Sequence, residues 1–359
     1  MRKFGFRTRI LALCTVSVIS ALIFGEQYTQ TTRYELDGAE CNEVLLTPNR
    51  DCLRILEFKQ SFEFGLGHQL SELVFAAYLS RRFEAAMKFP RFDTDLISTH
   101  HNDDYSFVQD FLGLNMFTSN SDLNTSALMH AQLTDLSNQE CNVVFKGAWN
   151  GCEENSTCFH SFLVHSAFRQ LAPCFRSASI RNGSWKSASP FPERASGIHI
   201  VWHIRVGDVE LHPAGDIFYK NLFDDLFSAL HTTKVVLYFI AEWRVLKAEE
   251  RQAYEDYLNN LIFGRWRTIF ISLSIHETLA YMMHADVLIG SGSSLPAVAA
   301  LFSDSTVYVN VMPKHGWNAQ FEFIDGLVAG QDGHLLNHAF EIQKMLCTRR
   351  HRCMYDVVT

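Results

Sequence analysis

The pattern of apolar and polar residues is most regular in the second half of the chain. From residue 198 onward, short apolar runs alternate with segments whose apolar residues recur every three to four positions. Such alternation predicts a parallel sheet covered by helices on both faces. The predicted strands are 198–204, 235–241, 268–272, 287–290 and 307–311, and the predicted helices are 217–230, 246–263, 276–283 and 296–302.

The first half shows the same succession once. Residues 53–59 predict a strand, residues 64–67 a tight glycine turn, and residues 69–83 a helix. Residues 84–190 predict mixed structure without a clear order of elements. Two prolines among small polar residues in 186–196 predict a linker.

These patterns predict an α/β protein of two Rossmann-like domains facing a cleft. The N-terminal α/β domain covers residues 51–190, and the C-terminal Rossmann-like domain covers residues 191–359. A chain of this length can bury two such cores. Because parallel sheets bind ligands at the carboxyl ends of their strands, we expect the binding site at those ends.

The N-terminus predicts an export segment. Basic residues, from Arg2 to Arg9, precede an uncharged apolar run over 10–24, and Glu26 follows it. This charge bias places the rest of the chain in the lumen. The run fits either a retained anchor in a thin Golgi membrane or a cleaved signal peptide, and the retained anchor is favoured. Residues 1–25 are thus the predicted cytoplasmic tail and anchor of a single-pass type II Golgi membrane protein, and 26–50 its stem.

Cysteine content and charge narrow the protein class. Three glycosylation sequons, at Asn124, Asn155 and Asn182, fit a lumenal surface. The net charge of −8 argues against a nucleic-acid partner. No C-x-x-C pair is present, so disulfides are favoured over a zinc site. The cysteines beyond the apolar run are Cys41, Cys52, Cys141, Cys152, Cys158, Cys174, Cys347 and Cys353.

The segment 285–302 is the most informative for chemistry. Its apolar strand, which begins after Asp286, leads into Ser291, Ser293 and Ser294 at the start of a helix. Such a turn presents backbone amides, small hydroxyls and the positive end of a helix dipole to one point, which suits a phosphate. The alternative is that Ser294 only caps an ordinary helix.

A second candidate lies where strand 198–204 ends. Arg205 could grip a diphosphate with its planar donors, and His203 and Asp208 could orient the diphosphate or the sugar. The alternatives are a surface salt bridge between Arg205 and Asp208, and a buried structural role for His203.

The third candidate is the early glycine turn. Gly65 and Gly67 allow the backbone to approach a ligand closely, although a plain tight turn is the simpler interpretation. His68 is our first candidate for a base, because an imidazole titrates near lumenal pH. Glu72 and Asp208 are the other candidates.

In this order, the three segments resemble the GT-B fucosyltransferases, especially the protein O-fucosyltransferases and the related α1,2 and α1,6 enzymes. The resemblance implies an inverting, metal-independent transfer from GDP-fucose or another nucleotide sugar to a glycan or glycoprotein. It implies that Arg205 binds the β-phosphate, that Ser293 and Ser294 contact the diphosphate, and that the glycine loop lies against donor and acceptor. The predicted donor-binding residues are Gly65, Gly67, His203, Arg205, Asp286, Ser291, Ser293 and Ser294, and the predicted catalytic residues are His68, Arg205 and Asp208.

Two other functions remain open. Asp93 and Asp95 have the D-x-D spacing with which metal-dependent glycosyltransferases hold Mn²⁺ on a sugar diphosphate. The chain could also be a non-catalytic carbohydrate-binding protein on the same fold. Residues 100–104 are rich in His and Asp, but adjacent side chains diverge, which favours a solvated loop over a metal site.

Overall fold

A computed structural model describes residues 51–59, 65–88, 105–115, 126, 128–132, 140–148, 171, 173–191, 197–206, 215–230, 234–290, 293–304, 306–310, 326–329, 332–335, 342 and 346. These residues all belong to the unit Gly38–Thr359. The predicted anchor and stem, residues 1–50, lie outside the described residues. In the part that is described, no helix is long and apolar enough to cross a membrane.

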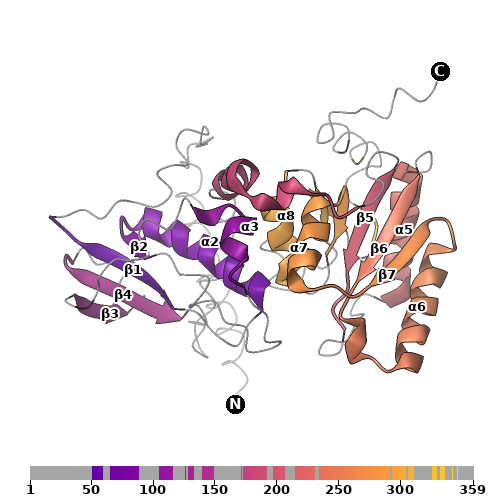
Figure 1. Ribbon diagram of the computed structural model, residues 1–359, viewed down its shortest axis with the longest axis horizontal. Coiled ribbons are helices and arrows are strands. Elements are labelled where there is room, and N and C mark those ends of the chain that lie inside the picture. Colours follow the sequence, from indigo (N-terminus) through magenta and orange to yellow (C-terminus); the bar gives the residue numbers. More distant parts are fainter. Residues whose placement is uncertain are drawn as a thin grey trace, which may run out of the picture. The chain divides into compact units, whose positions relative to one another are not determined.

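The second half of the chain forms a six-stranded parallel sheet (Figure 1). Every strand and helix predicted there is present, with ends that differ by at most two residues, and β10 is an additional edge strand. The predicted α/β class with parallel strands is thus confirmed. The strands are β5 (Ile198–His203), β6 (Val235–Ile240), β7 (Arg267–Ile271), β8 (Val287–Ile289), β9 (Val307–Asn310) and β10 (Gly326–Val328); the helices are α5 (Gly215–Leu230), α6 (Ala248–Ile262), α7 (Ile275–His284) and α8 (Ser294–Phe302), with the 3-10 turn η5 (Trp243–Val245).

The order of the strands is β10-β9-β8-β5-β6-β7. The chain therefore starts in the middle at β5, adds β6 and β7 on one side, and then adds β8, β9 and β10 on the other. This is the doubly wound order 3-2-1-4-5-6. The order reverses between β5 and β8, and ligands of such sheets bind outside the carboxyl ends of the strands at this point.

The buried position of α8 explains why this helix is apolar on all sides. Its residues from Leu295 to Phe302 are all buried. One side packs against the sheet near β9, and another packs against α2 (Leu66–Arg82). A helix that is hydrophobic all round needs such a sandwiched position. Trp202 packs between the sheet and α5. Its ring centroid lies 4.9 Å from that of Tyr219 and 5.4 Å from that of Phe223, both on α5.

The first half of the chain contains a smaller sheet of four parallel strands in the order β2-β1-β4-β3. The predicted strand and helix correspond to β1 and α2. The remaining strands were not predicted from the sequence. The strands are β1 (Arg54–Lys59), β2 (Ala86–Lys88), β3 (Met129–Gln132) and β4 (Val143–Ala148), and the short helix α3 (Val108–Phe111) follows β2.

In the described part of the predicted linker, residues 186–188 are exposed and Phe191 is buried. Residues 173–182 are helical, and the 3-10 turn η4 (Ser184–Ser187) follows them. Phe191 is only 4% exposed, and its ring stacks on that of His199 at 4.3 Å. An aromatic side chain among the small polar residues therefore holds this segment to the larger sheet. Each sheet falls within one of the two predicted domain ranges, and the division into domains stays a prediction.

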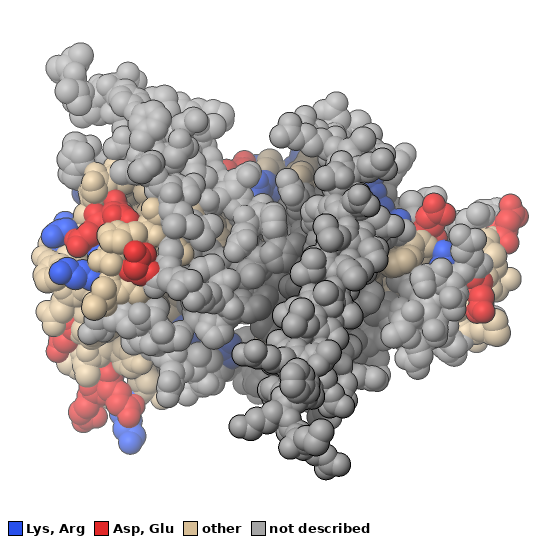
Figure 2. Space-filling model, turned by 180° about the vertical axis from the view of Figure 1, so that it is seen from behind, with Lys and Arg blue, Asp and Glu red and all other residues tan. Residues whose placement is uncertain are grey.

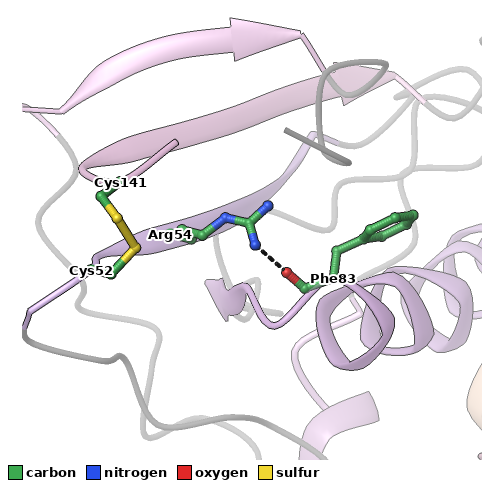
Figure 3. Close-up of a disulfide and its surroundings, with 4 residues drawn as sticks. All are labelled: Cys52, Arg54, Phe83 and Cys141. Carbon is green, nitrogen blue, oxygen red and sulfur yellow. Dashed lines mark hydrogen bonds between the residues drawn. A yellow bond between two sulfur atoms is a disulfide. The ribbon is translucent and has the colours of Figure 1, made fainter. Parts of the chain in front are cut away.

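A disulfide joins the residues that precede two neighbouring strands of the smaller sheet (Figure 3). Cys52 lies just before β1 and Cys141 just before β4, 89 residues apart in sequence. Arg54 of β1 donates a hydrogen bond of 2.6 Å from Nη1 to the carbonyl oxygen of Phe83, which follows α2. Cys174 is also disulfide-bonded. The prediction of disulfides is confirmed for these cysteines, and the others lie outside the described residues.

Removing the disulfide in the double variant Cys52→Ala/Cys141→Ala is expected to lower the free energy of unfolding by about 2–4 kcal/mol, because the bridge closes a long loop in the unfolded chain. Urea unfolding of the secreted protein measures this difference. Wild-type protein treated with a reductant should lose at least as much, because the reductant also breaks the disulfide of Cys174. Equal stability of the two proteins would show that β1 and β4 stay paired without the bridge.

Charges of both signs are mixed on the surface. Among the described residues on the face in Figure 2, Lys and Arg lie interspersed with Asp and Glu, without a continuous basic area. Some charges of the described residues form pairs, such as Arg251 Nε with Glu255 Oε1 at 2.7 Å. Such pairs contribute little to stability.

Candidate functional site

The two segments predicted to bind a diphosphate emerge at the same edge of the larger sheet. β5 and β8 are parallel neighbours, with Ile200 opposite Val287 and Trp202 opposite Ile289. Arg205 follows the end of β5, and Ser293 follows the end of β8. Both therefore lie beyond the carboxyl ends of adjacent strands, at the point where the strand order reverses.

Arg205 combines an exposed side chain with an anchored backbone. Its neighbours Ile204 and Val206 are buried, at 2% and 9% exposure. The amide of Ile204 donates a hydrogen bond of 2.9 Å to the carbonyl oxygen of Ile240, which holds this segment against β6. The Arg205 side chain is exposed. A guanidinium held in this way can form two parallel hydrogen bonds to a phosphate.

His203 is the last residue of β5 and is partly buried. Burial, together with the positive charge of Arg205, lowers the pKa of His203 to about 4. The imidazole is therefore neutral at neutral pH, when it can donate one hydrogen bond and accept another. It adds no positive charge to the site and is a weak base there.

The low pKa of His203 predicts acid sensitivity. In the unfolded chain the pKa of His203 is about 6.5. Between about pH 6.5 and 4, the unfolded state therefore binds a proton at His203 that the folded state does not bind. Stability from this residue is complete above about pH 6.5 and is lost as the pH falls toward 4. Between pH 7.5 and 5.0 the wild-type protein should lose about 2 kcal/mol more than His203→Gln in urea unfolding. Equal losses in both proteins would contradict the neutral, desolvated imidazole.

Ser293 is the N-cap of α8, whereas the sequence suggested Ser294 for that place. Its hydroxyl oxygen accepts a hydrogen bond of 3.3 Å from the amide of Leu295. Pro296 has no N–H. Of the amides in the first turn, that of Ser294 therefore remains for a ligand, as far as the described residues determine. It lies at the positive end of the helix dipole, beside the Ser294 hydroxyl.

Gly67 brings the early glycine segment against the start of α8. A Cβ added at Gly67 would clash with the Leu295 amide nitrogen and would lie 2.6 Å from Leu295 Cα and 2.8 Å from the carbonyl carbon of Ser294. Gly67 lies within α2 rather than in a tight turn, and Gly65 is its exposed N-cap. Two of the three predicted segments thus touch, backbone against backbone.

Asp286 is a correction to the sequence-based site. It precedes β8, so it lies at the amino end of that strand, opposite to the end where Ser293 follows. It is 5% exposed, and its Oδ2 accepts a hydrogen bond of 2.7 Å from the amide of His199. The carboxylate therefore ties β8 to β5, and the structure does not bring it together with Arg205 and the serines.

Other predicted residues lie partly or wholly outside the description. Asp208 and Ser291 are outside the described residues, as are Asp93, Asp95 and residues 100–104. The backbones of His68 and Glu72 belong to the first two turns of α2, but their side chains are not described. In the chain as far as it is described, no group of three or more His, Cys, Asp or Glu side chains could hold a metal ion.

Tyr308 is a residue of this region that sequence analysis missed. It lies on β9 and is 1% exposed. Its hydroxyl is the atom nearest to the place where a side chain at Gly290 would begin. The available signal was a glycine at the end of a strand with a tyrosine on the next strand, but only the register makes these two residues neighbours.

Comparison with known proteins adds no family. No protein-family model matches the sequence, and no curated protein matches it significantly. The likeness to fucosyltransferases thus depends on the three short segments described above, and membership of that family stays a prediction.

Proposed function

We propose that this chain is an inverting glycosyltransferase that transfers fucose from GDP-fucose to a glycan or glycoprotein in the Golgi lumen. One observation carries the proposal. An exposed arginine and the N-terminus of a helix follow the carboxyl ends of adjacent strands, at the reversal of a doubly wound sheet. This is where such sheets bind nucleotides, and the two groups are those that a diphosphate needs.

In the proposed reaction, an oxygen of the acceptor hydroxyl attacks the anomeric carbon of the sugar. The bond from that carbon to the diphosphate oxygen breaks, and its electron pair leaves with GDP. The guanidinium of Arg205 and the amide of Ser294 stabilise the charge that grows on the diphosphate. No metal is required in this scheme.

The proton of the acceptor hydroxyl passes to a base, for which His68 is our first candidate. Its backbone supports this choice, because His68 directly follows Gly67, which touches the start of α8. In the proposed GT-B arrangement, the start of α2 would then face both the donor and the acceptor. Glu72 and Asp208 remain the other candidates.

The proposed lumenal location is supported by the cysteines. Disulfides persist in the oxidising environment of the secretory pathway and are rare in the cytosol. The Cys52–Cys141 bridge fits that compartment. A single-pass type II anchor at the N-terminus is part of the same proposal.

A thermal-shift screen with GDP, UDP, GDP-fucose and GDP-mannose tests the function. GDP and its sugars should raise Tm, since a ligand at a hundred times its Kd stabilises the folded state by about 2.7 kcal/mol. Donor turnover should persist in EDTA. Turnover that EDTA abolishes would favour the metal-dependent alternative, and binding without turnover would favour a carbohydrate-binding protein. The proposal fails if neither GDP nor UDP raises Tm.

A further inference from the structure

Tyr308 reaches Gly290, the residue that follows β8, with the tip of its ring. An added Cβ at Gly290 would clash with the Tyr308 hydroxyl and would lie 2.9 Å from Cζ and 3.0 Å from Cε2. The hydroxyl end of the Tyr308 ring is thus the part nearest to Gly290. The amide of Gly290 donates a hydrogen bond of 3.0 Å to the carbonyl oxygen of Val309, which fixes the backbone at this contact.

The register explains why the tyrosine points there. Leu288 lies opposite Tyr308 in the parallel pair of β8 and β9, so the two side chains share one face of the sheet. Gly290 lies two positions after Leu288, so a side chain at Gly290 would point to the same face. α8 packs on β9. The phenol therefore fills the space that Gly290 leaves, at the beginning of the turn that leads into α8.

The Tyr308 hydroxyl is a neutral hydrogen-bond donor. Burial raises the pKa of Tyr308, so the phenol is protonated at neutral pH. Tyr308 as a residue is 1% exposed, and within the described part of the chain its hydroxyl forms no hydrogen bond. A phenol held at this place can donate its proton to an acceptor that arrives with a ligand.

We propose that the Tyr308 hydroxyl belongs to the diphosphate site and donates a hydrogen bond to a phosphate oxygen held between Gly290 and the start of α8. This inference rests on the proposed function of the same site. Together, Arg205, the Ser294 amide and the Tyr308 hydroxyl would bind the diphosphate from two neighbouring strand ends and from beneath the helix start. A phenol is a neutral donor, so it adds geometric selectivity for an anion without adding charge.

The substitution Tyr308→Phe tests this role, because it removes the hydroxyl and keeps the ring. Because Tyr308→Phe lacks one hydrogen bond to a charged group, its affinity for GDP, measured by calorimetry, should be about tenfold lower than that of the wild type. Inorganic pyrophosphate, used as a second probe, should lose affinity by the same factor. Without ligand, Tm should stay unchanged or rise slightly, because the oxygen has no partner to lose. Tyr238→Phe is the control, since Tyr238 is a buried tyrosine on β6 of the same sheet; its GDP affinity should equal that of the wild type.

The outcomes separate this inference from the proposed function. If the wild-type protein binds neither GDP nor pyrophosphate, the proposed function itself fails. If the wild type binds GDP and Arg205→Ala does not, but Tyr308→Phe binds as tightly as the wild type, only the role of Tyr308 is overturned. A lower Tm of ligand-free Tyr308→Phe with unchanged affinity would likewise assign the hydroxyl to stability alone.

Discussion

Replacing Arg205 with alanine is expected to lower kcat/KM for sugar transfer by about 10²–10³-fold, the effect of removing one preorganised donor from a developing anion. The guanidinium is exposed at an anchored strand end, so its loss should leave the fold intact. Arg205→Lys keeps the charge but not the planar pair of donors and should show an intermediate loss. Steady-state kinetics with GDP-fucose measures both variants.

A matched control exists in Arg265, which is also a surface arginine but pairs with Asp224 at 3.2 Å near the amino end of β7. Arg265→Ala should retain wild-type kcat/KM. Near-normal turnover by Arg205→Ala, with a Tm equal to that of the wild type, would refute the assignment of Arg205.

Gly67→Ala is expected to cost roughly 3 kcal/mol of folding stability, at the upper end of the range for overpacking. The added methyl group would meet the backbone of Leu295 and Ser294, and a backbone cannot rotate away as a side chain can. Helix propensity acts in the opposite direction, because alanine favours a helix by about 1 kcal/mol over glycine. A net loss of folding stability in Gly67→Ala would therefore show that the clash with the start of α8 outweighs the gain in helix propensity. Because the displaced turn belongs to the proposed donor site, transfer should fall with stability.

Gly65→Ala is the matched control for this prediction. Gly65 has a φ of −68°, and a Cβ added there meets nothing within 4 Å. Alanine is a poorer N-cap than glycine, which limits the expected loss to about 1 kcal/mol or less. Urea unfolding of the two variants provides the comparison. If Gly67→Ala is as stable as Gly65→Ala, α2 and α8 do not meet as described.

The larger sheet could be predicted because each of its elements is encoded locally. Buried strands such as 235–240, with every residue apolar and buried, alternate with amphipathic helices, and the period of the pattern changes at each boundary. The edge strand β10 was missed because its three residues begin with a glycine, which is unfavourable inside a strand. In the smaller sheet, β2 is equally short, and its pairing with β1 depends on a register that no local pattern specifies.

The candidate site was predictable in part. Arg205 and the Ser293 turn follow apolar strands, and the carboxyl ends of parallel strands share one edge, so sequence order alone suggested that they meet there. The same reasoning misplaced Asp286, which precedes its strand and lies at the opposite edge. The reason for Gly67 could not be deduced, since its partner is the backbone of a helix more than two hundred residues later in the chain.

The central claim is that the guanidinium of Arg205 and the start of α8 hold one diphosphate. A crystal structure of the protein with bound GDP tests it most directly. We expect phosphate oxygens within hydrogen-bonding distance, about 2.7–3.2 Å, of both an Arg205 nitrogen and the amide of Ser294. A nucleotide bound elsewhere, or one that reaches only one of these two groups, would contradict the account.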